Sequence, residues 1–396
     1  MTRRGQVDVV VVGGGIVGAA CALALAADGL DVVLVEARAP PPWPVVPPDL
    51  RVYALAPDSQ ALLAGLGAWP GTSRNHGAAG VHPYRHMRVW DAGGGGDLAF
   101  DADRLGRREF GWITAHGLLV NGLWRALDQG AVSVRCPVRV DALARHGDGV
   151  ELRLDDGSRV HARIAIGADG AGSTLRTLAG IAVDTHDYGQ TGVVAFVATA
   201  LAHEDTAWQR FLPGGPLALL PCADGASSIV WTLPTDEADA VLALDDATFG
   251  RAVTDASAGR LGAVTPLSTR AGFPLRRQLA ATCAADRVLL VGDAAHVVHP
   301  LAGQGMNIGL RDVLALRDTV AAARSRDAAW DAAPRLARWS RARRSEAAVA
   351  AHALEGINRL FSTDAMAPVL LRGSMLGLAG RLPPVAAGLW RRASGL

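Results

Sequence analysis

The amino-acid sequence predicts an α/β protein: a Rossmann-like domain with a parallel sheet, an antiparallel β-sheet domain, and a C-terminal helical segment. Three observations predict this architecture. An apolar strand runs into a glycine-rich turn near the N-terminus, alternating apolar segments follow Tyr188, and a second buried strand at residues 286–293 precedes a largely helical region. With 396 residues the chain also exceeds the size at which single cores usually divide, which favours two subdomains.

The first forty residues form the most informative unit. The run VDVVVV at residues 7–12 is β-branched, as expected of a strand buried on both faces. GGGIVG follows and places Gly13, Gly15 and Gly18 in a G-x-G-x-x-G register; an apolar helix and then the strand DVVLVEAR come next. Strand, glycine turn, helix and strand in this order predict a dinucleotide-binding unit.

Each residue of this unit has a physical task. Gly13 permits the tight turn, Gly15 lets the backbone approach a pyrophosphate, and Gly18 lets helix and strand pack closely. The helix N-terminus offers free N–H groups and a partial positive charge to the phosphates. Glu36 ends the second strand and can accept hydrogen bonds from a ribose diol, whereas it would repel the 2′-phosphate of NADP. The pattern does not distinguish FAD from NAD.

The remaining elements follow in order along the chain. Residues 39–49 are proline-rich and predict an extended connection, after which a short strand leads into a helix that ends near Leu66. LLVNGLWRALDQG predicts an amphipathic helix, and residues 132–166 alternate as strands with turns at RHGDG and DDGS. Segments after Tyr188 read as an antiparallel sheet with tight turns and no long helices between its strands.

Composition excludes several classes of function. The formal net charge is +1, which gives no reason to expect a nucleic-acid partner. No lysine occurs, so a Schiff-base mechanism is excluded. The four cysteines form no C-x-x-C pair, which favours a reduced, cytoplasmic compartment. The apolar stretch at residues 7–27 could pass for a signal peptide or membrane span, but Asp8 and the spaced glycines favour the soluble motif.

The segment GDAAHVVHPLAGQGMNIGLRD at residues 292–312 admits two interpretations. His296 and His299 are spaced as in an H-x-x-H metal site, but a catalytic zinc needs about three protein ligands and no distant Cys/His cluster supplies the third. The alternative is a backbone loop shaped around a flat organic cofactor, with glycines that let the main chain approach a ring. We favour the cofactor and expect no metal.

With these motifs in view, the chain resembles the class A flavoprotein monooxygenases, which share the para-hydroxybenzoate hydroxylase fold. Three motifs carry the resemblance over essentially the whole chain: GGGIVG…VEAR, GADGAGSTLR at residues 167–176, and the segment at residues 292–312. The stretches HPYRHMRVW and TPLSTRAGFPLRR look most like the ubiquinone-biosynthesis hydroxylases that act on a prenylphenol ring. One departure is Thr114-Ala115-His116, where the family usually carries Val-Glu-Asn.

The resemblance implies a division of the chain and a set of site residues. Residues 1–78, 104–182 and 266–345 would form the FAD-binding domain, residues 79–103 and 183–265 the substrate-binding β-sheet domain, and residues 346–396 the C-terminal helical segment. The expected FAD-contacting residues are Gly13, Gly15, Gly18, Glu36, Arg38, Arg51, Asp169, Gly292, Asp293, Pro300, Gly303, Gly305, Met306 and Asn307. His299 and Pro300 are the candidate catalytic residues, and Phe211, Leu219 and Trp231 the candidate substrate-pocket residues. A purely structural turn role for Asp169, a surface role for Arg51, a structural role for His299 and core packing for each pocket residue remain alternatives.

The implied reaction is hydroxylation of the aromatic ring of a polyprenylphenol in ubiquinone biosynthesis, through a flavin hydroperoxide formed with dioxygen. NAD(P)H or a separate reductase would supply electrons. A hydroxylase of another small phenol, or a non-catalytic flavin-binding subunit of a quinone-synthesis complex, stays open. The arginines and apolar residues of the C-terminal segment suggest a peripheral membrane contact, and association with other quinone-biosynthesis proteins is also expected. The ring position, prenyl length and oligomeric state cannot be read from the sequence.

Overall fold

The parallel sheet predicted for the Rossmann-like unit is the centre of the first layer. The computed structural model describes residues 5–44, 49–71, 80–93, 97–299 and 303–361. Strands run in the order β18-β19-β11-β1-β2-β8, with the hairpin β9–β10 attached to β11. Pairings among β19, β11, β1, β2 and β8 are parallel. The bounds are β1 Gln6–Val12, β2 Val32–Val35, β8 Val132–Arg135, β9 Val140–His146, β10 Gly149–Leu154, β11 Arg159–Gly167, β18 Ala284–Ala285 and β19 Val288–Leu290.

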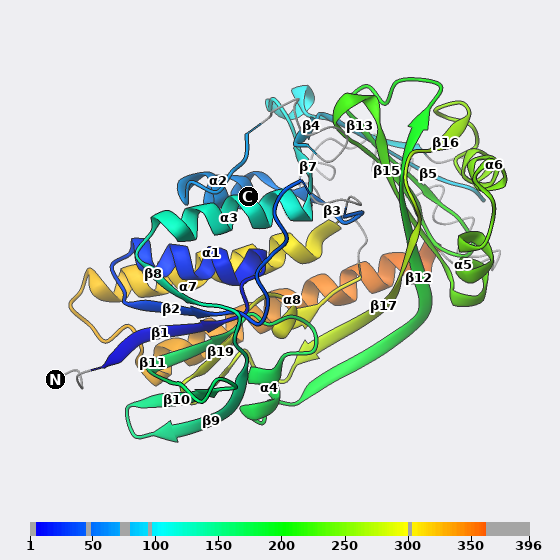
Figure 1. Cartoon of the computed structure of the whole chain (residues 1–396). Helices are drawn as coiled ribbons and strands as arrows, with labels where there is room; N and C mark the ends of the chain where they lie inside the picture. Colours follow the sequence, from blue (N-terminus) through cyan, green and yellow to red (C-terminus); the bar gives the residue numbers. More distant parts are fainter. Residues whose placement is uncertain (1–4, 45–48, 72–79, 94–96, 300–302, 362–396) are drawn as a thin grey trace.

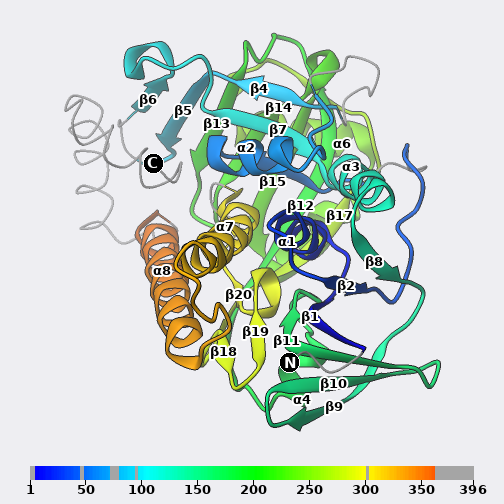
Figure 2. The same ribbon diagram turned by 90° about the vertical axis from the view of Figure 1, so that its left-hand side faces the viewer.

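Helices cover this sheet. Figures 1 and 2 show α3, α1 and α7 side by side over one face, with α8 next to α7. The apolar run of β1 and the small residues of α1 are almost completely buried in one core, as expected of a strand covered on both sides. The bounds are α1 Ile16–Ala27, α2 Pro57–Gly65, α3 His116–Gln129, α4 Thr174–Leu178, α7 Gln304–Arg324 and α8 Ala333–Phe361.

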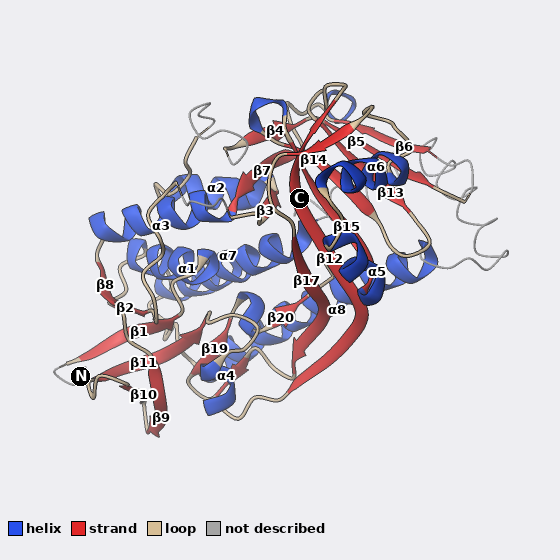
Figure 3. Cartoon of the chain, turned by 45° about the vertical axis from the view of Figure 1, so that its right-hand side comes forward, coloured by secondary structure: helices blue, strands red, loops and turns tan. Residues whose placement is uncertain are grey.

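A second, mostly antiparallel sheet stands beside this layer. Its order is β20-β17-β12-β15-β14-β13-β5-β6, and β16 also pairs with β12. The long strands β12 and β17 run from the helical layer into this sheet (Figure 3). The bounds are β5 His86–Asp91, β6 Asp97–Asp101, β12 Val183–Thr199, β13 Thr206–Phe211, β14 Leu217–Pro221, β15 Ser227–Pro234, β16 Val264–Pro266, β17 Ala271–Ala280 and β20 His296–Val297.

Two short helices pack on the outer face of the second sheet. These are α5 Thr235–Leu242 and α6 Asp246–Ala256, and Phe249 and Val253 of α6 join the core formed with that face. A small third sheet has the strand order β3-β7-β4. Its strands are β3 Val52–Leu55, β4 His82–Tyr84 and β7 Gly111–Ala115. The predicted fold class is therefore confirmed.

One predicted boundary differs from the strand pairing. The last part of the predicted FAD-binding domain begins at residue 266, whereas β17 pairs with β12 over ten residue pairs inside the antiparallel sheet. The alternating pattern of β17 resembles that of any half-buried strand, so its sequence does not reveal which sheet it joins. Within the described residues, no helix is both long and apolar enough to cross a membrane.

Candidate cofactor and substrate site

Four predicted site residues follow the carboxyl ends of neighbouring parallel strands. Gly13 follows β1, Glu36 follows β2, Asp169 comes shortly after β11, and Asp293 comes shortly after β19. These strands are adjacent in the order β19-β11-β1-β2, so the four positions meet at one edge of the sheet. Ligands of open α/β sheets bind at this edge.

The glycine turn has the geometry that its sequence predicts. Gly13 has a φ of +104°, and a Cβ there would lie 2.5 Å from the carbonyl oxygen of Ala168. A Cβ on Gly18 would lie 1.9 Å from the carbonyl oxygen of Gly13, so helix and turn approach too closely for any side chain. Gly15 caps α1, and a Cβ there would meet no atom within 4 Å. Its missing side chain thus leaves open the space in front of the helix N-terminus, where a phosphate would fit.

Glu36 holds the turn from the side. Its carboxylate accepts hydrogen bonds from the backbone N–H groups of Gly14 and Arg38. The indole N–H of Trp124, on α3, donates to the carbonyl oxygen of Gly14 at 2.8 Å. The carboxylate therefore fixes the turn and, at the same time, lies at the cleft surface where a ribose would be bound.

Asp169 shapes a second turn at this edge. Its carboxylate accepts from the hydroxyl of Ser173 at 2.5 Å and from the backbone N–H of Leu175 at 3.1 Å, at the start of α4. Buried Arg176 donates to the carbonyl oxygens of Ala171 and Ala294, at 2.8 and 2.9 Å. Arg176 thus ties the GADGAGSTLR motif to the turn that carries Asp293. The motif alone did not predict this role of Arg176.

Most of the predicted cofactor residues line two adjoining cavities. A cavity of about 630 Å³ runs along the sheet edge, and an adjoining cavity of about 370 Å³ lies under the second sheet. Tyr53, Asp293 and Met306 line both. The first is also lined by Gly13, Gly15, Glu36, Arg38, Arg51 and Asp169, and the second by Gly303, Gly305 and Asn307. Gly18 and Gly292 are buried behind the lining.

Asp293 lies at the junction of the two cavities. Gly292, with a φ of +58°, begins the single helical turn that presents Asp293 after β19. The carboxylate is open to the cavity, yet protein surrounds the cavity on most sides. Desolvation therefore raises the pKa of Asp293, while nearby His296 opposes the shift.

Pro300, a predicted cofactor and catalytic residue in the loop before α7, lies outside the described residues. Gly303 has a φ of +62° and caps α7, directing the N-terminus of that helix at the cavity. The side chain of Asn307 is fully engaged. Its oxygen accepts from Ala56 N–H and the Ser59 hydroxyl, both at 2.8 Å, and its amide donates to the carbonyl oxygen of Ala54 at 2.8 Å. Asn307 thus locks α7 to the β3–α2 connection, and only its backbone is open to a ligand.

A buried ionic network lies behind the Asp293 turn. Asp312 on α7 accepts from His296 at 2.7 Å, from the backbone N–H of Gly292 at 2.9 Å, and from Arg343 of α8 at 2.7 Å. Burial alone would lower the pKa of His296, but the Asp312 carboxylate and its hydrogen bond raise it. His296 is therefore held by a carboxylate inside the protein. A charged residue in an otherwise buried helix face was the signal that could have revealed Asp312.

His299 does not belong to the described lining of either cavity. Its side chain is 1% exposed, and its ring lies 5.0 Å from that of Tyr188, measured between centroids, in an edge-on contact. Burial lowers its pKa to about 4, so the imidazole is neutral near pH 7. The described lining of the two cavities does not include His299, and its catalytic role stays a prediction.

Arg51 and His116 also line the larger of the two cavities. Arg51 forms a two-point ion pair with Asp49, at 2.6 and 3.0 Å, and its side chain is about half exposed. His116 begins α3, and its Nδ1 lies 3.0 Å from the Tyr53 hydroxyl. Burial is the main cause that lowers its pKa to about 4, assisted by Arg51. The residue at the family departure thus lines the cleft as a neutral imidazole.

The predicted substrate-pocket residues pack in hydrophobic cores and do not belong to the described lining of the cavity. Leu219 and Trp231 point away from the cavity into the core under α5 and α6. Side chains alternate between the faces of a strand, so their neighbours line the cavity instead: Ala218, Leu220, Val230 and Thr232. Phe211 packs farther along, against Val89 and Leu98. Apolar residues occupy both faces of these strands, and the sequence alone therefore did not show which face holds the pocket.

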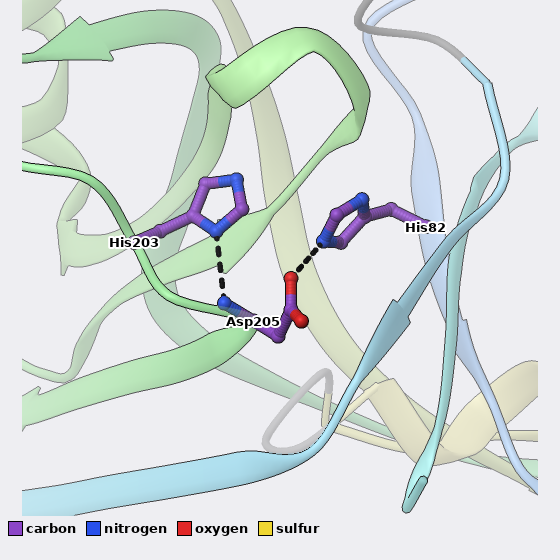
Figure 4. Close-up of side chains that lie close together, drawn as sticks. All are labelled: His82, His203 and Asp205. Atoms are coloured by element: carbon purple, nitrogen blue, oxygen red, sulfur yellow. Dashed lines mark hydrogen bonds and ion pairs between the residues drawn. The ribbon is translucent and has the colours of Figure 1, made fainter. Parts of the chain in front are cut away.

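Among the described residues, one group has the side chains to hold a metal ion: His82, His203 and Asp205. Figure 4 shows His82 directed at the Asp205 carboxylate, 2.8 Å away, and the His203 ring against the Asp205 backbone. The Nδ1 atom of His203 accepts from Asp205 N–H at 3.2 Å, and its Nε2 atom lies 3.1 Å from the carbonyl oxygen of Cys222. Both ring nitrogens of His203 and the Nε2 atom of His82 already have protein partners. The group acts as a hydrogen-bonded clip between β4 and the turn before β13.

The glycine turn and the cleft fit the class of FAD-binding proteins, and comparison with known proteins agrees. The family model described as "FAD binding domain" matches residues 6–351. The solved p-nitrophenol 4-monooxygenase of Pseudomonas putida superposes with a TM-score of 0.78 at 20% identity, covering 98% of each chain. HpxO of Klebsiella pneumoniae, solved with FAD and uric acid, gives 0.74 at 21%, covering 99% of this chain and 97% of that one.

Curated relatives narrow the family. The 3-demethoxyubiquinol 3-hydroxylase of Escherichia coli is 38% identical over 86% of either chain. The ubiquinone hydroxylase UbiL of Rhodospirillum rubrum is 36% identical over 98% of this chain and 89% of its own. The chain therefore belongs to the FAD-dependent ubiquinone-biosynthesis hydroxylases, and it is an FAD-dependent aromatic-ring monooxygenase.

Proposed function

We propose that this enzyme hydroxylates the ring of a polyprenylated phenol during ubiquinone biosynthesis, using FAD held along the edge of the parallel sheet. One observation carries the proposal: the cleft that begins at the glycine turn opens directly into an apolar cavity under the second sheet. A dinucleotide in the first part would reach the second with its ring end. The relatives named for demethoxyubiquinol and ubiquinone hydroxylation favour a hydrophobic phenolic substrate there.

The residues of the cleft fit FAD in a definite order. The N-terminus of α1 and the bare backbone of Gly15 would hold the pyrophosphate, and Glu36 the adenosine ribose. Asp293 would accept hydrogen bonds from the ribityl chain. Gly303 and the N-terminus of α7 would face the ring system, where the helix dipole favours the negative charge of reduced flavin.

The bound cofactor supplies dioxygen activation, and the protein orients the ring and excludes water. NAD(P)H or a separate reductase would reduce the flavin, with dioxygen as co-substrate. Incubating the yellow holoenzyme with NADPH or NADH under anaerobic conditions tests the donor. Bleaching of the flavin band would identify a direct nicotinamide donor, and an unchanged band would identify a separate reductase.

The pathway assignment is tested in cells. Deletion of the gene should lower the quinone pool and accumulate a prenylated precursor that lacks one ring hydroxyl, as detected by mass spectrometry. Re-expression of the chain should restore the pool, whereas a Gly18→Ala variant, which cannot form the glycine turn, should not. A normal quinone pool in the deletion strain would refute the assignment.

A polyprenyl substrate resides in the bilayer, so we also propose a cytoplasmic enzyme in peripheral contact with the membrane and with other quinone-biosynthesis proteins. The part of the C-terminal segment that would make this contact, residues 366–396, lies outside the described residues. A chain truncated after Ala365 should lose sedimentation with membranes while keeping its flavin. Unchanged sedimentation would remove the membrane role of this segment.

A further inference from the structure

The cavity under the second sheet is apolar except for a few side chains, and several of these have hydrogen-bonding atoms without a partner among the described residues. Most of its wall is aliphatic or aromatic, including Met87, Ile113 and Val230. The side-chain polar groups of Tyr84, Gln209 and Thr232 also line it, and none of them has a hydrogen-bond partner among the described residues. Polar groups inside proteins are usually paired, so unpaired ones facing a cavity indicate where a ligand supplies the missing partner.

Tyr84 is held firmly in this position. A Cβ on Gly111, the residue opposite Tyr84 in β7, would lie 3.1 Å from the tyrosine ring, so the ring packs where Gly111 leaves room. The Phe110 ring lies 6.2 Å away between centroids. The next residue, Arg85, donates its backbone N–H to the carbonyl oxygen of Asp205 at 2.8 Å. The clip between His82 and Asp205 therefore anchors the strand that carries Tyr84.

Gln209 reaches the same cavity from the second sheet. It lies opposite Ala218 in the β13–β14 pair, and Ala218 lies opposite Val230 in the β14–β15 pair. All three therefore share the sheet face that lines the cavity. Tyr84 and Gln209 thus approach one apolar cavity from two different sheets. They lie far apart in the sequence, so no local motif reveals that they meet.

The Tyr84 hydroxyl is a donor throughout the working pH range. Burial raises its pKa to about 12, so the phenol stays protonated. A neutral donor suits an oxygen atom of an electron-rich ring, and above all one that carries developing negative charge. The Gln209 amide can both donate and accept, so it suits a second ring oxygen, either hydroxyl or methoxy.

We propose that Tyr84 and Gln209 bind the ring oxygens of the aromatic substrate and thereby select its orientation. The inference rests on the proposed function. A phenol that enters an apolar cavity loses its hydrogen bonds to water, and these two side chains replace them. Ring orientation decides which carbon faces the flavin, so Tyr84 is a specificity-determining residue and Gln209 its partner.

The test measures binding to the oxidised, flavin-loaded enzyme without turnover. A short-chain prenylphenol and its analogue lacking the ring hydroxyl are titrated against the flavin absorbance of the parent enzyme, Tyr84→Phe and Gln209→Leu. Tyr84→Phe should weaken binding of the phenol about tenfold, which corresponds to about 1.4 kcal/mol, and should leave binding of the deoxy analogue within twofold. Tyr188→Phe removes a hydroxyl from a tyrosine outside the cavity lining and serves as the matched control.

Product analysis adds a second readout. With dioxygen and reductant, Tyr84→Phe should release more hydrogen peroxide per hydroxylated product than the parent, because a misoriented ring reacts poorly. If Tyr84→Phe and Gln209→Leu both bind phenol and deoxy analogue with the parent's preference, the inference is overturned while the proposed function stands. If the parent itself binds no prenylphenol and hydroxylates none, the proposed function fails instead.

Discussion

Removing the Asp312 carboxylate should destabilise the protein far more than removing an exposed carboxylate. Asp312 is 1% exposed and accepts three hydrogen bonds, from Gly292, His296 and Arg343. In Asp312→Ala the guanidinium of Arg343 stays buried, at 6% side-chain exposure, without its main counter-charge. Breaking a buried ion pair in this way costs about 3–5 kcal/mol. The unpaired backbone N–H of Gly292 adds about 1–3 kcal/mol.

The assay is urea denaturation of the flavin-loaded protein, with flavin fluorescence and far-UV circular dichroism followed together. Asp141→Ala is the control: Asp141 pairs with Arg153 at 2.6 Å, but both side chains are about half exposed. Such surface pairs contribute about 0–1 kcal/mol. A loss of less than about 1 kcal/mol in Asp312→Ala, similar to the control, would refute the argument that this network supports the Asp293 turn.

The network also gives the variant a distinct pH profile. The pKa of His296 is raised in the folded protein, so its contribution to stability is full below its unfolded pKa and is lost as pH rises through the folded value. Desolvation would raise the pKa of Asp312, but His296 and Arg343 lower it, so its contribution is lost as pH falls through the folded value. The parent should therefore lose stability on both sides of a central range. Asp312→Ala should lack the loss at high pH. It should still lose stability as pH falls, because burial without the carboxylate lowers the pKa of His296.

Three further predictions test the rest of the site. Gly15→Ala should fold with a loss of about 1 kcal/mol yet bind FAD much more weakly, because the new methyl group enters the cleft; Gly18→Ala should lose both fold stability and FAD, since its Cβ meets backbone. Equal FAD affinity of Gly15→Ala and the parent in fluorescence titrations would contradict this placement. Leu219→Ala should lower the free energy of unfolding by about 2–5 kcal/mol and leave substrate affinity unchanged. Ala218→Leu should leave stability unchanged and weaken substrate binding. The opposite pattern in paired melting and binding experiments would show that the other face of the sheet lines the pocket. Burial lowers the pKa of His299 from 6.5 to about 4, so the unfolded chain holds one more proton between these values and stability falls with falling pH. His299→Asn should remove about 1.4 kcal/mol per pH unit from that slope. If denaturation shows the same change in unfolding free energy between pH 6 and pH 5 for both proteins, a buried neutral imidazole is excluded.

The glycine turn could be predicted because its constraints are local. The positive φ of Gly13, the contact between Gly18 and Gly13, and the carboxylate of Glu36 all arise within one strand–turn–helix–strand unit. Its residue pattern allows few other backbone paths. Asp293 was predictable through family resemblance, since nothing in its own segment distinguishes it from an ordinary turn aspartate.

The cavity under the second sheet could not be predicted, because its constraints are non-local. Leu219 and Leu220 are the same residue type in adjacent positions, and the packing of α5 and α6 on one face decides that Leu219 enters the core. A shift of one residue exchanges the two faces of a strand. Likewise, Asp312 becomes part of the site only when α8 brings Arg343 to it.

The two halves of the cleft differ in the groups that line them. The half at the sheet edge is built from backbone groups and short turns, which suit a cofactor of fixed shape. The half under the second sheet is built from side chains of separate strands, including Tyr84 and Gln209, which can change one at a time without disturbing the glycine turn. Substitutions there can alter ring selection while FAD binding is preserved. The proposed substrate contacts Tyr84 and Gln209, on β4 and β13, therefore lie on other elements than the turns that would hold FAD.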